Sequence, residues 1–260
     1  MKYGYDFSGY SRDMLTRRIE SRLSKSRLDN ITDMTSRVIP DPDFFSSLIY
    51  DISIPVTEMF RDPHVYSQLK KKIFPILKTY PCINIWHAGC ATGEEVYSMA
   101  IALKEEGLYD RARIYATDIN DRALKTAAEG IYPIDRIKKY TQNYQDSSGR
   151  FSFSNYYHAM YDSAKIDESL KENITFANHN LVTDGVFAEM NLILSRNVFI
   201  YFNKDLQNKV LKLFDMSLCR NGFLCLGCSE SLSFTDSEKD FIEIDGNANI
   251  YQKKKSKITI

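Results

Sequence analysis

Several acidic and amide side chains stand directly after short apolar runs, where they could bind a polar ligand. Glu95 follows a glycine-containing turn, and Asp118 closes the next apolar run. Asn180 and Asn197 follow two later runs. An ionised carboxylate only accepts hydrogen bonds, so Asp118 could satisfy two donor hydroxyl groups of a sugar. Asparagine both donates and accepts, which suits the edge of an adenine or an amino-acid head group. These residue types indicate a ligand with hydroxyl groups and a mixed donor and acceptor edge.

The turn before Glu95 belongs to residues 84–98, Asn-Ile-Trp-His-Ala-Gly-Cys-Ala-Thr-Gly-Glu-Glu-Val-Tyr-Ser. Apolar residues first form a short run and then recur at helical spacing, which predicts a strand, a tight turn and a helix. This succession begins an open parallel α/β sheet, in which ligands bind at the carboxyl ends of the strands. Glycines such as Gly89 let the backbone approach a ligand closely.

The same turn excludes two common phosphate sites. Its glycines, Gly89 and Gly93, do not have the spacing of the dinucleotide fingerprint, and no Lys-Ser or Lys-Thr pair follows as in a phosphate loop. Glu94 and Glu95 would repel a phosphate group. A cationic or polyhydroxylated ligand fits better, and the sulfonium and the ribose of S-adenosylmethionine meet both descriptions.

Structural roles could also explain the acidic residues. Thr92 and Glu95 have the Thr-x-x-Glu spacing of a capping box, in which both side chains bond the first turn of a helix. Asp118 could cap the helix that we predict to begin near Asp121. A capping role would not prevent Glu95 from contacting a ligand above the helix start.

A hydroxyl and a guanidinium group stand four residues apart in the turn-like stretch 55–63, as Thr57 and Arg61. A guanidinium group can bind a carboxylate through two parallel hydrogen bonds, so Arg61 is a candidate ligand-binding residue. The alternative is an ordinary surface ion pair of Arg61 with Asp62 or Glu58.

The patterns predict three parts along the chain. Residues 1–52 form an N-terminal helical domain, in which Arg17, Arg18 and Arg22 concentrate positive charge on one helix. That charge is either a solvated face or a docking surface for an acidic partner helix. Residues 53–80 form a linker and a helix.

Residues 81–260 follow the rhythm of a parallel α/β sheet, interrupted between residues 131 and 175 by a region rich in aromatic residues. Alternation at 151–153 predicts a strand there, so we expect a small antiparallel β subdomain inserted at about 145–175. This insertion could bind a partner or be a compact core. The strands predicted for the main sheet lie at 83–86, 112–117, 174–177, 192–194, 223–226 and 248–251.

Composition narrows the class of protein. The 260 residues contain 34 lysines and arginines and 34 aspartates and glutamates, so no net charge indicates nucleic acid or a membrane surface as partner. No apolar run reaches the roughly 18 residues that span a bilayer, and the first residues lack the apolar segment of a signal peptide. Five cysteines, mostly in apolar surroundings, suggest reduced thiols and a cytoplasmic location. Cys225 and Cys228 are interpreted as core residues, because no second pair completes a zinc site.

Six segments in order form a shared pattern over nearly the whole chain, namely Thr57–Arg61, Trp86–Ser98, Ala116–Asn120, Asn178–Leu181, Arg196–Phe202 and Gly227–Leu232. With these segments the chain resembles the CheR-type chemotaxis receptor methyltransferases of bacteria. The resemblance implies an α/β fold, namely a Rossmann-like S-adenosylmethionine-dependent methyltransferase sheet with an N-terminal helical domain and an inserted β subdomain. It also implies S-adenosylmethionine as cofactor, S-adenosylhomocysteine as product, and methyl esters on glutamates in the cytoplasmic helical region of a chemoreceptor or related signalling protein.

The resemblance, together with the turn pattern, assigns expected roles to individual residues. In the family, the basic N-terminal helix approaches the acidic receptor, which makes Arg17, Arg18 and Arg22 candidates for substrate docking. Many members also use the β insertion to dock partner sequences. The cofactor-binding candidates are Thr57, Arg61, Gly89, Glu95, Asp118, Ile119, Asn180, Leu181 and Asn197.

Methyl transfer to an ionised carboxylate needs no general base, so we expect catalysis from alignment in a dry pocket. Arg61 and Arg196 are the cations expected to orient charge, and Tyr201 could form a wall or donate a hydrogen bond near the methyl group. Arg196 could instead be a simple ion-pair partner. Two other functions stay open: a non-catalytic signalling module that binds S-adenosylmethionine or S-adenosylhomocysteine, and a small-molecule methyltransferase, which the basic helix disfavours.

The sequence departs from the family pattern at three places. The first turn is His-Ala-Gly-Cys-Ala at residues 87–91, where Ser-Ala-Gly-Cys-Ser or Ser-Ala-Ala-Cys-Ser is commoner. Pro55 stands where the linker usually has Asn or Ser two residues before Thr57, so one side-chain contact is missing. Residues 156–161 of the insertion do not resemble the version that binds receptor tails. A signalling cluster other than flagellar chemotaxis is therefore a second setting for the enzyme.

Overall fold

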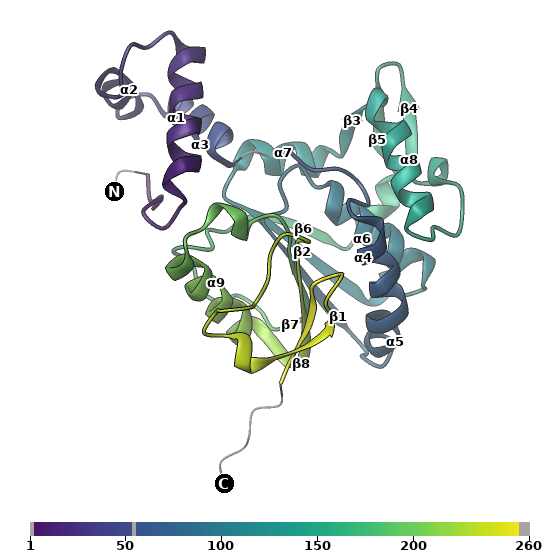
Figure 1. Cartoon of the computed structure of the whole chain (residues 1–260). Helices are drawn as coiled ribbons and strands as arrows, with labels where there is room; N and C mark the ends of the chain where they lie inside the picture. Colours follow the sequence, from purple (N-terminus) through teal and green to yellow (C-terminus); the bar gives the residue numbers. More distant parts are fainter. Residues whose placement is uncertain (1–2, 54–55, 255–260) are drawn as a thin grey trace.

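The computed structural model describes residues 3–53 and 56–254, so Pro55 lies outside the described residues. Figure 1 shows a group of helices at the N-terminus beside a central α/β body, and a small sheet on the other side of that body. This arrangement confirms the predicted fold class.

The main sheet contains seven strands in the order β6-β2-β1-β7-β8-β10-β9. Its first five strands are parallel, and β10 pairs antiparallel with both β8 and β9. The chain runs outward from β1 to β2 and β6 and then returns to β7, so the order reverses between β1 and β7. Such a reversal opens a crevice at the carboxyl ends of the strands, where ligands bind. The strands are β1 (Ile83–Ala88), β2 (Ala112–Asp118), β6 (Ile174–Asn178), β7 (Met190–Ser195), β8 (Leu218–Leu226), β9 (Phe241–Asp245) and β10 (Ile250–Lys253).

All six predicted strands of the main sheet are present, whereas β9 was not predicted. Neighbouring residues of β1 point to opposite faces, as the alternation of a strand requires. Ile85 packs in the core on the side of α6, and Trp86 packs in the core on the side of α9. Figure 1 shows α4, α5 and α6 on one side of the sheet and α9 on the other. Burial on both faces explains the continuous apolar runs of these strands. The helices are α4 (Pro63–Gln68), α5 (Phe74–Leu77), α6 (Glu94–Glu105), α7 (Asp121–Glu129) and α9 (Lys204–Ser217).

The N-terminal helices form a small core of their own and dock on the main body. Tyr10 forms an isolated bridge with Phe202, and the Ser11 N–H donates to the Tyr201 carbonyl at 2.8 Å. The Tyr5 hydroxyl donates to the carbonyl of Ile119, the residue after β2, at 3.1 Å. These bonds place the N-terminal domain over the carboxyl edge of the sheet. Its helices are α1 (Arg12–Ser26), α2 (Ile31–Val38) and α3 (Pro42–Ser53).

The small sheet has the order β3-β5-β4 and follows the main-body helices α6 and α7 in the sequence. The strand predicted at residues 151–153 is wrong, because Phe153–Tyr156 forms a 3₁₀ helix and Phe151 is exposed. The first strand also lies before the predicted range 145–175. Its elements are β3 (Ile131–Pro133), α8 (Ile137–Asp146), β4 (Tyr157–Met160) and β5 (Ser163–Ile166).

Candidate functional site

A pocket of about 390 Å³ lies at the carboxyl ends of the parallel strands, within the range of roughly 300–1,000 Å³ typical of small-molecule sites. The linker, the turn after β1, the ends of β2 and β7, and the N-terminal domain all contribute to its lining. Ten residues singled out from the sequence meet there, although they are spread over 145 positions of the chain. They are Thr57, Arg61, Gly89, Glu95, Asp118, Ile119, Leu181, Arg196, Asn197 and Tyr201.

Asn180 is the one cofactor-binding candidate that is not among the residues lining this pocket. Its side-chain oxygen accepts from the Val182 N–H at 2.9 Å, and its own N–H donates to Asp184 at 2.9 Å. These bonds form a local turn of the kind that asparagine favours. The neighbouring Leu181 faces the pocket instead, so the geometry gives no support to a side-chain contact by Asn180.

Asp118 is held as an acceptor at the end of β2. Its Oδ2 accepts from the Ala91 N–H at 2.8 Å, and its Oδ1 accepts from the Asn120 N–H at 2.9 Å. The alternative role as a helix cap is wrong, because the Asn120 side chain caps α7 by accepting from Arg122 and Ala123. Burial raises the pKa of Asp118, while the backbone hydrogen bonds oppose this shift. Each oxygen keeps further acceptor capacity, which fits a pair of sugar hydroxyl groups.

The predicted capping box at the start of α6 is wrong. Gly93 occupies the N-cap position with φ 89°, and no side chain caps the helix. The Thr92 hydroxyl donates to the Glu94 carboxylate at 2.6 Å, and Tyr140 also bonds Glu94, which is fully buried. Of the two acidic residues expected to favour a cationic ligand, only Glu95 lines the pocket.

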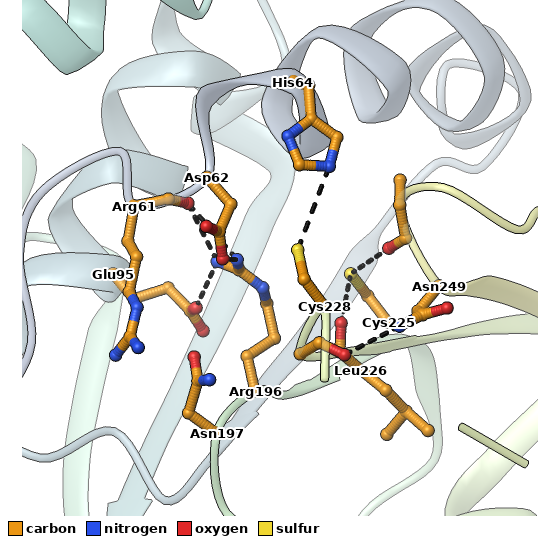
Figure 2. Close-up of polar contacts among 12 residues, drawn as sticks. Arg61, Asp62, His64, Glu95, Arg196, Asn197, Cys225, Leu226, Cys228 and Asn249 are labelled. Atoms are coloured by element: carbon orange, nitrogen blue, oxygen red, sulfur yellow. Dashed lines mark hydrogen bonds and ion pairs between the residues drawn. The ribbon is translucent and has the colours of Figure 1, made fainter. Parts of the chain in front are cut away.

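Arg196 is the centre of a buried ion-pair network beside the pocket (Figure 2). Its guanidinium group lies 2.9 Å from Glu95 and 2.6 Å from Asp62, and it donates twice to the Arg61 carbonyl at 3.2 Å. His87 contacts the other oxygen of Glu95 at 3.0 Å. Burial opposes ionisation of Glu95, but the hydrogen bond with His87 and the charge of Arg196 outweigh it and lower the pKa. The ion-pair interpretation of Arg196 therefore describes the geometry better than that of a cation free to orient substrate.

Arg61 has the opposite environment. Asp62 pairs with Arg196, and Glu58 accepts from Asn143 at 3.2 Å, so the expected surface ion pairs of Arg61 do not form. Within residues 3–53 and 56–254, the Arg61 guanidinium makes no hydrogen bond or ion pair, although it lines the pocket. Figure 2 shows it turned away from Asp62. A guanidinium group in this position is available to a carboxylate.

The turn after β1 brings two strand ends together. The N–H groups of Gly89 and Cys90 both donate to the Thr117 carbonyl, at 2.8 and 2.9 Å. Gly89 has φ 83°, and a Cβ atom there would lie 2.6 Å from the Val198 side chain, so only glycine fits. Ala91 has φ 49°, a strained value for alanine, and its N–H is the one that bonds Asp118.

The pocket also contains residues that were not predicted. Tyr10, Ile52 and Ser53 come from the N-terminal domain, and Phe202 forms an edge contact with the Tyr10 ring at 5.1 Å. Nothing in the local sequence pattern distinguishes Tyr10 from other aromatic residues, because its place depends on how two domains dock. His179 also lines the pocket, and its place in the segment Asn178–Leu181 is the sequence signal that indicates it.

The three arginines of α1 have different surroundings. Burial raises the pKa of Tyr201, whereas the positive charges of Arg18, Arg61 and Arg17 lower it, which places Arg17 and Arg18 within electrostatic reach of the pocket. Arg17 is exposed. Arg22 instead pairs with Asp51 at 3.2 Å within the N-terminal domain, so it is less available for docking.

Cys225 and Cys228 differ in burial, and neither lines the pocket. Cys225 is buried as predicted, but Cys228 is exposed and lies 3.8 Å from His64 (Figure 2), so its interpretation as a core residue is wrong. The described part of the chain holds no group of three or more His, Cys, Asp or Glu side chains placed to bind a metal. It also holds no helix long and apolar enough to cross a membrane.

Comparison with known families gives two adjoining matches. Residues 55–249 match the family described as "CheR methyltransferase, SAM binding domain". Residues 1–53 match "CheR methyltransferase, all-alpha domain".

Individual relatives agree with these matches. "Putative methyltransferase Cher3" of Pseudomonas putida is 46% identical over 97% of this chain and 93% of its own length. A "Chemotaxis protein methyltransferase" of Borreliella burgdorferi is 30% identical over 88% of this chain and 84% of its own. Among solved structures, an O-methyltransferase of Brevibacillus brevis in complex with S-adenosylhomocysteine shares 13% identity. The superposition covers 83% of this chain and 53% of the Brevibacillus brevis chain, with a TM-score of 0.40.

Proposed function

The chain belongs to the CheR methyltransferase family and is an S-adenosylmethionine-dependent methyltransferase of the chemotaxis type, and we propose that it forms methyl esters on glutamate side chains of a chemoreceptor or related signalling protein. The cofactor follows from the family; the substrate and the roles of the site residues are the proposal.

The residues of the pocket fit the cofactor. Asp118 would accept hydrogen bonds from the ribose hydroxyl groups, because its oxygens keep acceptor capacity beyond their two backbone donors. Ile119 and Leu181 provide apolar surface for the adenine ring. Thr57 and Asn197 place a hydroxyl and an amide in the same lining. When bound, the cofactor supplies an electrophilic methyl group on a sulfonium.

The observation behind the proposal is that the Arg61 guanidinium lines the pocket without a partner among the described residues, which makes it a binding site for a carboxylate. A glutamate side chain is already a nucleophile when ionised, so the protein has only to bind, align and desolvate it. Arg61 would hold a carboxylate in the pocket, either that of the acceptor or that of the methionine part of the cofactor. Tyr201 lies in the same lining, and it would form a wall or donate a hydrogen bond beside the transferred group.

Two surfaces would bring the acceptor to the pocket. Arg17 and Arg18 carry positive charge near Tyr201, which suits an acidic helix approaching from the side of α1. The small sheet β3-β5-β4 is the second candidate for docking a partner sequence. We assign Arg196 a positioning role, because its charge is already neutralised by Glu95 and Asp62.

The test is transfer of a radiolabelled methyl group from S-adenosylmethionine to cytoplasmic fragments of chemoreceptors, followed by mild alkali. We expect labelled protein that releases labelled methanol, because carboxyl methyl esters hydrolyse in alkali and methylated amines do not. Alkali-stable label would contradict the proposed carboxylate acceptor. Binding of S-adenosylhomocysteine without any transfer would favour the non-catalytic module, and turnover without protein would favour a small-molecule methyltransferase.

A further inference from the structure

Glu230 is a buried carboxylate bonded to the backbone of a pocket loop rather than to a cation. It lies in the loop after β8 and is 6% exposed. Its Oε2 accepts from the Gly227 N–H at 2.7 Å and from the Asn197 N–H at 3.0 Å. Its Oε1 accepts from the Ile200 N–H at 3.3 Å. Among the described residues it makes no ion pair within 4 Å, so the backbone N–H groups are what stabilise its charge.

Glu230 bonds the loop that follows β7, and side chains of this loop line the pocket. Asn197 has φ 61°, a left-handed conformation that costs energy in most residues, and Phe199–Tyr201 form a single 3₁₀ turn. The pocket lining includes Asn197, Val198, Ile200 and Tyr201 of this loop. A segment with so few regular backbone bonds needs outside acceptors to keep one conformation.

Gly227 and Asn249 surround Glu230 and allow its carboxylate to contact the Asn197 N–H. A Cβ atom at Gly227 would lie 2.7 Å from the Asn197 nitrogen and 2.7 Å from the Glu230 Oε2, so glycine is required there. On the far side, the Asn249 amide donates to the carbonyls of Gly227 and Glu230 at 2.7 and 2.6 Å. Asn249 does not line the pocket, yet it holds both ends of the Gly227–Glu230 turn.

We propose that Glu230 is a positioning residue for methyl transfer: its carboxylate bonds Asn197 and Ile200 through their N–H groups and thereby sets the orientation of Asn197 and Tyr201 in the pocket. Glu230 itself is not part of the lining, so it acts through these residues and touches neither cofactor nor acceptor. Glu230 is not among the residues to which the family resemblance gives a role. The transfer readout rests on the proposed function, whereas the binding readout requires only the cofactor pocket.

Burial affects the ionisation of the Glu230 carboxylate. It raises the pKa of Glu230, and the backbone N–H bonds oppose that shift. Neutralising the carboxylate would weaken all of these bonds at once, because hydrogen bonds to an ionised acceptor are about twice as strong as neutral ones.

The experiment compares Glu230→Gln with the control Glu238→Gln. Glutamine keeps the size of the side chain but replaces one acceptor oxygen with a donor that faces backbone N–H groups. Glu238 also accepts a backbone bond, from the Phe234 N–H at 2.9 Å, but it is exposed at the start of the 3₁₀ helix Glu238–Asp240 and lies outside the lining. Calorimetry would give the Kd for S-adenosylhomocysteine and the stoichiometry, and methyl transfer would give kcat and KM.

We expect Glu230→Gln to weaken binding of S-adenosylhomocysteine by about tenfold and to lower kcat as well, at full binding stoichiometry. The control should stay within about twofold. A merely structural role would lower the melting temperature or the stoichiometry and leave the Kd and kcat of the folded fraction unchanged, and that result would overturn the proposal. If Glu230→Gln does not fold, Asn249→Ala tests the same support from outside the pocket. It should weaken binding in the same direction by a smaller factor, and unchanged binding would equally overturn the proposal.

The two proposals can fail separately. Loss of S-adenosylhomocysteine affinity in Glu230→Gln would support the positioning role even if the unaltered protein methylated no receptor fragment. Transfer to receptor glutamates with unchanged behaviour of Glu230→Gln would support the acceptor and reject the positioning role.

Discussion

Arg196 and Glu95 form a buried ion pair at 2.9 Å, and this pair separates the roles of the two arginines beside the pocket. The Arg196 side chain is 1% exposed and also takes up Asp62, the neighbour of Arg61 in sequence. Arg61 is thereby left without a carboxylate partner within the described chain and lines the pocket as an available cation. Arg196 therefore stabilises the site through its ion pairs, whereas the Arg61 guanidinium has no partner in the part of the chain that the structure describes.

Replacing Arg61 with alanine should impair methyl transfer strongly, because no other described side chain can take over its bidentate contact with a carboxylate. We expect kcat/KM to fall about 100-fold, as for loss of a charge-assisted hydrogen-bonding pair. Steady-state transfer to a receptor fragment measures this. Arg113→Ala, an exposed arginine on β2, is the control and should behave like the unaltered protein. Retention of more than half of the activity in Arg61→Ala would contradict the role.

Asp118→Asn should weaken binding of S-adenosylhomocysteine at least about tenfold, because an amide cannot accept with both of its ends. The pKa of Asp118 is raised above 3.8, so its protonation begins at higher pH than for an ordinary aspartate. Below that raised pKa, affinity of the unaltered protein should fall by up to about tenfold per pH unit.

Calorimetry at several pH values checks both statements about Asp118. The variant should lose the acid-dependent part of the affinity, and the exposed control Asp110→Asn should keep it. A pH profile in Asp118→Asn that matches the unaltered protein would show that another group controls the binding.

Arg196→Met should destabilise the fold by about 3 kcal/mol, because it leaves Glu95 without its cation in a buried site. Urea unfolding followed by circular dichroism gives the free energy of unfolding. Adding Glu95→Gln to Arg196→Met should restore part of the stability, since the uncompensated charge is removed. A loss of less than about 1 kcal/mol in the single variant would mean that the pair behaves like a surface ion pair.

Tyr10→Ala should weaken S-adenosylhomocysteine binding about fivefold, because it removes a pocket wall contributed by the N-terminal domain. Tyr10→Phe keeps the ring and its edge contact with Phe202 and should bind within about twofold of the unaltered protein. The control is Tyr161→Ala, whose side chain is fully exposed in the turn between β4 and β5. Equal affinities for all three variants would place Tyr10 outside the binding surface.

Reversing the charge of Arg17 and Arg18 to glutamate should lower methylation of a receptor fragment about tenfold at physiological salt and leave S-adenosylhomocysteine affinity unchanged. The loss should appear mainly in KM and should shrink at high salt, because screened charges no longer steer the acceptor. Arg220→Glu, on exposed surface of β8, serves as the comparison. An effect on cofactor affinity instead of KM would argue against a docking role.

The segment from β1 to α6 could be predicted from the sequence because its signals are local. Apolar periodicity marks the strand and the helix, and glycines mark the turn between them. The role of Asp118 as a hydrogen-bond acceptor could also be predicted from the sequence, because a parallel sheet places the carboxyl ends of its strands on one edge. The family resemblance added Thr57, Arg61 and Asn197 as cofactor-binding candidates, and the structure places all three in the lining of one pocket.

What only the tertiary structure decided is which partner each polar side chain takes. The spacing of Thr92 and Glu95 is compatible with a capping box, but Arg196, a hundred residues away, pairs with Glu95 instead. Asn180 turns into its own loop, and Tyr10 enters the pocket only because two domains dock. Local sequence sets backbone preferences within a few residues, whereas ion pairs, burial and pocket walls depend on contacts between segments that the linear pattern does not relate. The sequence by itself therefore determined six strands of the seven-stranded sheet, the turn after β1 and the class of ligand, and the folded chain determined which charged groups pair around that ligand.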